Sequence, residues 1–167
     1  MSSSHNLSPD PRVQLRRTEL FHLNSAPHPA LGIDYGDARI GVAATDPLGI
    51  LAHPVETIPL ASTDPIERIA ILCEQRGIRT LVLGLPLNLD GEEGPAAEKV
   101  RRFARKIELR LPDLPLIYVD ESHTTVAASA KLREAGRKAK QQKAIIDQAA
   151  AVEILNLWLA EHEPPLL

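Results

Sequence analysis

Three acidic residues stand where their carboxylates could act on one ligand. Asp34 and Glu121 each end an apolar run of the kind that forms a buried strand, and Asp147 lies in a long helical segment. Carboxylate oxygens are hard ligands that suit Mg²⁺ or Mn²⁺. Two such ions about 4 Å apart can activate water and stabilise the leaving oxygen of a phosphodiester. The acids therefore predict metal-dependent hydrolysis without a covalent nucleophile.

Asp34 is followed closely by Gly36, whose missing side chain would let a metal or phosphate approach the backbone. The alternative for Asp34 is an Asx turn, in which the carboxylate bonds its own backbone, although Asp37 suits that role better. Asp120 and Glu121 form a pair at a strand end. Their alternative role is to favour the N-terminus of a following helix by charge and hydrogen bonding.

Asp147 is the most informative of the three acids. At helical spacing its stripe continues through Ala151, Ile154 and Trp158, so its carboxylate should point toward packed protein. A buried carboxylate needs a partner, and metal could supply it. The alternative is an acid of the first helical turn, stabilised by the helix N-terminus or by Lys143.

Basic residues precede Asp147 with only one acid, Glu134, among them. The members of this track are Lys131, Arg133, Arg137, Lys138, Lys140 and Lys143. We expect the track to bind nucleic-acid phosphates in a salt-dependent manner, because it leads directly to Asp147. A second basic set is interpreted as a solvated helix face; it comprises Arg101, Arg102, Arg105, Lys106 and Arg110.

The elements that must position these residues predict an α/β fold. Expected strands are 30–34, 39–45, 51–58, 79–84 and 116–119; expected helices are 65–76, 95–110, 124–135 and 140–162. His53 and Pro54 restrict the third strand to an edge or bulged position. The order predicts a mixed five-stranded sheet, an antiparallel meander plus two parallel strands, with helices on both faces. Ligands collect at the carboxyl ends of parallel strands, where Asp34, Asp120 and Glu121 lie.

Bulk properties favour one soluble, cytoplasmic domain. The chain has 167 residues, 44% of them apolar, and a net charge of −3. We expect an N-terminal extension at 1–28, mobile or irregular, a domain at 29–162 and a tail at 163–167. No apolar segment resembles a secretory signal or a membrane span. Cys73, the sole cysteine, is expected to be a buried small hydrophobe in a reducing compartment.

Four ordered blocks resemble the YqgF-type family, described both as Holliday junction resolvases and as pre-16S rRNA nucleases. They are LGIDYGDARIGVAATDPLGI at 31–50, LVLGLPLNLDGEEGPAAEKVRRFA at 81–104, DESHTT at 120–125 and IIDQAAAVEIL at 145–155. The resemblance implies a ribonuclease H-like fold, divalent metal, a cytoplasmic bacterial protein and maturation of the 5′ end of 16S rRNA. It maps the catalytic, metal-binding carboxylates onto Asp34, Glu121 and Asp147.

The same blocks imply further residues facing the site. These are Gly36, Asn88, Asp120, Ser122, His123 and Thr124. The family usually carries Arg directly after the Asp-Glu pair, followed by an apolar residue, where this chain has Ser122 and His123. The change removes a bidentate phosphate or carboxylate clamp, which a protonated His123 could replace only in part.

Three other functions remain open on the sequence. Resolution of four-way DNA junctions needs the same metal chemistry and a two-fold homodimer, whereas RNA is the favoured substrate. A non-catalytic ribosome-assembly RNA-binding protein would keep the fold and the basic track. ATP binding is suggested by the likeness of DYGDARIG at 34–41 to the phosphate hairpin of actin-like and sugar kinases, but the chain is too short for a second nucleotide-clasping lobe.

Overall fold

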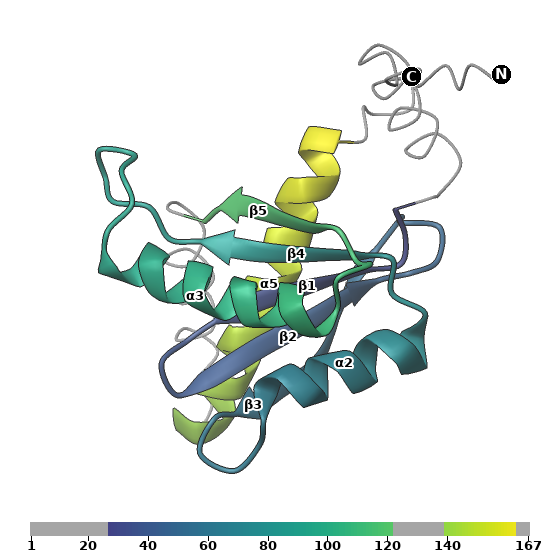
Figure 1. The fold of residues 1–167 in the computed structure, drawn as a ribbon, viewed down its shortest axis with the longest axis horizontal. Coiled ribbons are helices and arrows are strands. Elements are labelled where there is room, and N and C mark those ends of the chain that lie inside the picture. Colours follow the sequence, from purple (N-terminus) through teal and green to yellow (C-terminus); the bar gives the residue numbers. More distant parts are fainter. Residues whose placement is uncertain (1–26, 122–138, 163–167) are drawn as a thin grey trace, which may run out of the picture.

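A mixed five-stranded sheet forms the middle of the structure, a computed structural model that describes residues 27–121 and 139–162 (Figure 1). The strands are β1 (Ala30–Tyr35), β2 (Arg39–Thr45), β3 (Ala52–Pro59), β4 (Thr80–Leu85) and β5 (Leu116–Asp120). Their order is β3-β2-β1-β4-β5. The first three strands form an antiparallel meander, and β4 and β5 run parallel to β1. This is the mixed five-stranded sheet that the sequence predicted.

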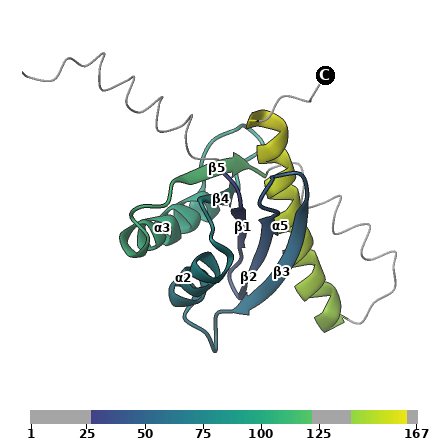
Figure 2. The same cartoon turned by 90° about the vertical axis from the view of Figure 1, so that its right-hand side faces the viewer.

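Helices cover both faces of the sheet, as expected. The helices α2 (Pro65–Arg76) and α3 (Pro95–Arg110) lie on one face, and α5 (Ala139–His162) crosses the other (Figure 2). Strand residues alternate between two cores. Leu31, Ile33 and their equivalents pack toward α2 and α3, whereas Ala43 and Val82 pack with the α5 residues Ile154 and Trp158. The face that receives α5 is the one that matters for the acids.

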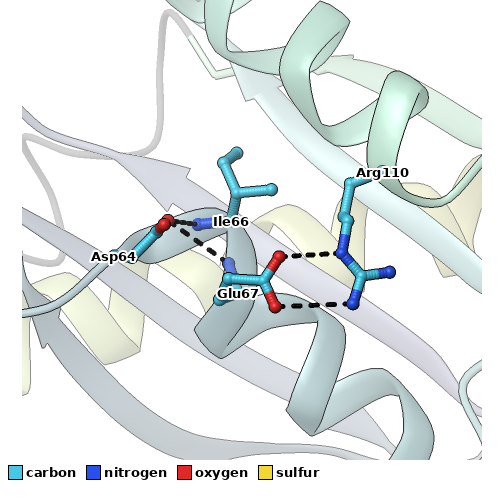
Figure 3. Close-up of polar contacts among 4 residues, drawn as sticks. All are labelled: Asp64, Ile66, Glu67 and Arg110. Carbon is cyan, nitrogen blue, oxygen red and sulfur yellow. Dashed lines mark hydrogen bonds and ion pairs between the residues drawn. The ribbon is translucent and has the colours of Figure 1, made fainter.

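Local signals at the ends of α2 agree with the sequence. Asp64 caps the helix by accepting hydrogen bonds from the backbone N–H groups of Ile66 and Glu67, and Gly77 ends it in the left-handed conformation. Arg110 at the end of α3 donates from Nε to Glu67 at 2.8 Å, which ties the two helices together (Figure 3). This exposed pair contributes little to stability.

The edge strand β3 is irregular where the sequence predicts it to be. Its register with β2 shifts between Val42 and Ala43, opposite the stretch that contains His53 and Pro54. A bulge at this place accommodates the proline, which cannot donate to the ladder.

The described fold also includes His28, whose ring packs against that of Trp158 with centroids 5.3 Å apart.

Three glycines let α5 lie unusually close to the sheet. A Cβ at Gly41 would be 1.9 Å from the carbonyl oxygen of Asp147, and one at Gly32 would be 2.8 Å from that of Ala151. A Cβ at Gly84 would meet Ile154 at 2.5 Å. At Gly41 and Gly32 the obstructing atoms include backbone carbonyl oxygens of α5, which no side-chain rotation can move away. The glycines therefore set the height of Asp147 above the strands.

Cys73 is buried, as predicted, and burial raises the pKa of its thiol to about 12. In the described part of the chain, no helix is both long and apolar enough to cross a membrane. The expected helix at 124–135, most of the N-terminal extension and the tail at 163–167 lie outside the described residues.

Candidate active site

The three predicted acids come to the same face of the sheet. Asp34 lies near the carboxyl end of β1, opposite Gly41 of β2, and Glu121 directly follows β5, where its N–H donates to the carbonyl of Leu85. Asp147 comes from α5, whose backbone rests on Gly41. Strands and helix thus place carboxylates from three distant parts of the chain over one end of the sheet.

Asp34 and Glu121 form a tightly coupled carboxyl pair. Burial and the charge of Asp147 raise the pKa of Asp34 to about 6, although a hydrogen bond with Glu121 acts in the opposite direction. Burial raises the pKa of Glu121 to about 8, together with the charge of Asp34, the hydrogen bond to Asp34 and the charge of Asp120. Two buried carboxylates this close resist simultaneous ionisation, so the pair retains a proton near neutral pH.

Asp147 has a partner that the sequence did not reveal. Arg39 Nε donates to Asp147 Oδ2 at 2.7 Å, with side chains 35% and 20% exposed respectively. The expected stripe is confirmed, because Ala151, Ile154 and Trp158 are all buried. Asp147 lies well beyond the first turn of α5, which begins at Ala139, and it forms an ion pair with Arg39. The helix-start alternative for Asp147 is therefore wrong.

The chemistry of the three acids fits a divalent cation. A cation would relieve the repulsion that raises the pKa values of Asp34 and Glu121. Gly84 leaves room for the carboxylate of Glu121, since a Cβ there would lie 2.5 Å from Glu121 Oε2. Among residues 27–121 and 139–162, however, no three His, Cys, Asp or Glu side chains already form a metal-binding group. Holding an ion with all three acids would require Asp147 to turn from Arg39.

Three of the other residues predicted to face the site lie in the described part of the chain. Gly36 makes the β1–β2 turn, with its N–H donating to the carbonyl of Arg39 at 2.9 Å. Asn88 is exposed and packs at the base of its loop against Gly94. Asp120 lies two positions after Tyr118 in β5, so its side chain is on the same face as that of Tyr118, toward α3. The charge of Asp120 raises the pKa of Glu121.

Much of the predicted nucleic-acid track, and three residues predicted to face the site, lie outside the described part of the chain. Ser122, His123, Thr124, Lys131, Arg133, Arg137 and Lys138 lie outside the described residues. Lys140 belongs to the first turn of α5, and its side chain is also outside the description. Lys143 is exposed and precedes Asp147 by one helical turn on the same side of α5.

Arg39 is the functional candidate that sequence reasoning missed. It begins β2 and lies on the same face of that strand as Gly41 and Ala43, so its side chain is on the α5 face. A strand-edge arginine two positions from a glycine opposite Asp34 was a detectable signal. Its partner was not, because Arg39 and Asp147 are 108 positions apart in sequence.

The carboxyl pair predicts that stability without divalent ions falls as pH rises. Folded-state pKa values of about 6 and about 8 exceed the ordinary values of 3.8 and 4.5. The native state therefore holds protons more tightly, and this stabilisation is lost as pH rises from about 4 to about 8. Thermal unfolding in EDTA should show the loss. The Asp34→Asn/Glu121→Gln double variant should gain about 1–3 kcal/mol at pH 8.5; an unchanged pH slope in that variant would refute the coupling.

Several known proteins are similar in sequence to this chain. The RuvX family, described as "Holliday junction resolvase", matches residues 28–161. A Nocardioides sp. protein is 51% identical over 130 residues, covering 75% of this chain and 83% of its own length. An Acetivibrio thermocellus protein is 44% identical over 131 residues, covering 77% and 93%. Both are named "Putative pre-16S rRNA nuclease".

One solved structure is similar to this chain at low sequence identity. T. thermophilus RuvC in complex with Holliday junction substrate is 12% identical, with a TM-score of 0.49, over 80% of this chain and 95% of that chain. Residues 28–161 include every described strand and helix except the last residue of α5. The match spans most of the chain, and the relatives are far more than 30% identical. This chain therefore belongs to the RuvX family, as its YqgF-type motifs predicted.

Proposed function

We propose that this protein is a divalent-metal-dependent endonuclease that cuts phosphodiester bonds in structured nucleic acid. The observation that carries the proposal is the buried Asp34–Glu121 carboxyl pair with the charge of Asp147 beside it. A fold that brings three acids together at a sheet end loses stability by doing so. Such a cost is typical of a site kept for binding or catalysis.

Each acid has a distinct role in the proposed site. Asp34 of β1 and Glu121, which follows β5, lie on either side of the parallel strand β4. They would bind Mg²⁺ or Mn²⁺ between them, and Asp147 would complete the ligand set from α5. The bound ions would supply an activated water and charge neutralisation at the leaving oxygen, in the two-metal manner. Before an ion binds, the two carboxyls share a proton near neutral pH, because burial and mutual repulsion raise the pKa of both. That proton must leave for both carboxylates to act as ligands.

The favoured substrate is RNA, specifically the precursor of 16S rRNA at its 5′ end, which places the protein in ribosome biogenesis in the cytoplasm. The names of the relatives support this choice. Lys143, exposed one turn from Asp147, together with Lys140 and the track that precedes it, would bind phosphates. The second candidate is a four-way DNA junction, favoured by the family description, and it would require a homodimer.

Cleavage of two labelled substrates tests the proposal. Purified protein with millimolar Mg²⁺ or Mn²⁺ is given pre-16S rRNA 5′-leader RNA and a four-way DNA junction at one salt concentration. We expect the RNA to be cut and the cutting to stop with EDTA. Cutting of the junction alone would replace RNA with DNA as the substrate. Binding of RNA without cutting in either metal would overturn the enzymatic proposal and favour a ribosome-assembly binder.

A further inference from the structure

Arg39 holds an acid that the proposed site also needs. Its Nε donates to Asp147 Oδ2 at 2.7 Å, and this ion pair joins the start of β2 to α5. Gly41 fixes the distance, because the α5 backbone at Asp147 rests directly on that glycine. Both side chains are only partly exposed, so the attraction between them is screened less than at an open surface.

A divalent ion and Arg39 would compete for Asp147. When all three acids are ionised, they carry three negative charges. The guanidinium of Arg39 offsets one of these charges, because its Nε lies within hydrogen-bond distance of Asp147 Oδ2, a proposed ligand oxygen. An ion that binds Asp147 Oδ2 would displace the Nε–H group of Arg39 from that oxygen. Arginine has five N–H donors in a planar fork, so a guanidinium released from Asp147 is well suited to a phosphate.

We propose that Arg39 is a two-position residue: it orients Asp147 in the metal-free protein and moves to a phosphate of the nucleic acid when Asp147 turns to the metal. The inference rests on the proposed function for the metal and the substrate class. It adds a residue and a sequence of events that the three acids alone do not give. Arg39 reaches the site from β2, on the side of Asp34 opposite β4 and Glu121, so it would contact substrate from that side.

Two variants and a matched control test the inference. Arg39→Gln removes the charge, and Arg39→Lys keeps it while losing the planar fork. Arg68→Gln is the control, because Arg68 pairs with Glu56 with similarly exposed side chains, 34% and 27%, but lies at the junction of α2 and β3. Mn²⁺ affinity is measured by titration without nucleic acid. Affinity for the 5′-leader RNA is measured in Ca²⁺ over a range of salt concentrations.

The expected pattern has opposite signs in the two assays. Arg39→Gln should bind Mn²⁺ about 3- to 10-fold more tightly, because a competing positive charge has gone. It should bind RNA about 5- to 30-fold more weakly, and its salt slope should fall by about one. Arg39→Lys should resemble the wild type toward Mn²⁺ and lie between the two toward RNA. Arg68→Gln should change neither affinity.

Two results would overturn the inference. Weaker Mn²⁺ binding by Arg39→Gln would mean that Arg39 only scaffolds Asp147, and an unchanged RNA affinity would mean that Arg39 never reaches phosphate. If Arg39→Gln fails to fold, the same comparison is made with Arg39→Lys, for which unchanged RNA affinity is the contradicting result. Neither assay requires cleavage, so a protein that binds RNA and Mn²⁺ in this pattern but never cuts would refute the proposed function and leave the Arg39 inference standing.

Discussion

Replacing Asp34 with Asn should lower the rate of nucleic-acid cleavage by about 10³-fold, while RNA affinity changes by less than about threefold. The amide keeps the size of the side chain but loses the charge that a divalent ion needs. Removing a charge from the crowded acidic group should also leave the fold intact or more stable, since burial and the charge of Asp147 both oppose ionisation of Asp34. Single-turnover cleavage and RNA titration measure the two effects separately.

Asp37→Asn is the matched control for this variant. It makes the same chemical change three positions along the same hairpin, at a side chain that is 82% exposed and pairs with Lys99. We expect its cleavage rate to stay within about twofold of the wild type, because surface pairs contribute little. A rate for Asp34→Asn above a tenth of the wild-type rate would remove Asp34 from the proposed catalytic group.

Replacing Gly41 with Ala should destabilise the fold by about 3 kcal/mol or more and lower the melting temperature by about 10 °C. A Cβ at this position would stand 1.9 Å from the carbonyl oxygen and 2.3 Å from the carbonyl carbon of Asp147. The backbone of α5 must move away to admit a methyl group. Since α5 carries Asp147 and much of one core, both stability and cleavage should suffer.

Gly77→Ala separates this steric effect from the ordinary cost of losing a glycine. Gly77 ends α2 with φ +61, and a Cβ there would have nothing within 4 Å. Its substitution should therefore cost only about 1 kcal/mol, from backbone conformation alone. Thermal unfolding of both variants makes the comparison. An equal or smaller loss for Gly41→Ala would show that α5 does not need its close approach to β2.

The sequence was sufficient for the fold because each element carries a local signal. The apolar runs of β4 and β1, the cap at Asp64 and the irregular β3 around Pro54 all depend on residues close in the chain. Two of the acids were also local inferences, since Asp34 and Glu121 end apolar strands. Asp147 came from helical periodicity, and the burial of its stripe confirms that reasoning.

What could not be predicted depends on contacts between distant segments. Periodicity placed Asp147 against protein but could not choose its partner, which in the structure is Arg39. The tight approach of α5 to Gly41 depends on the packing of a helix over a strand from the other end of the chain. The proton shared by Asp34 and Glu121 likewise arises only when β1 and the end of β5 are assembled in one sheet.

A crystal structure with millimolar Mn²⁺, using the anomalous signal of the metal, tests the central claim most directly. We predict Mn²⁺ within about 2.0–2.6 Å of carboxylate oxygens of both Asp34 and Glu121, with Asp147 turned from Arg39 toward the ion. Crystals of Asp34→Asn under the same conditions should lack that signal. Absence of Mn²⁺ at these acids in the wild-type crystals, with Asp147 still bonded to Arg39, would contradict the claim that the three carboxylates form a metal-dependent active site.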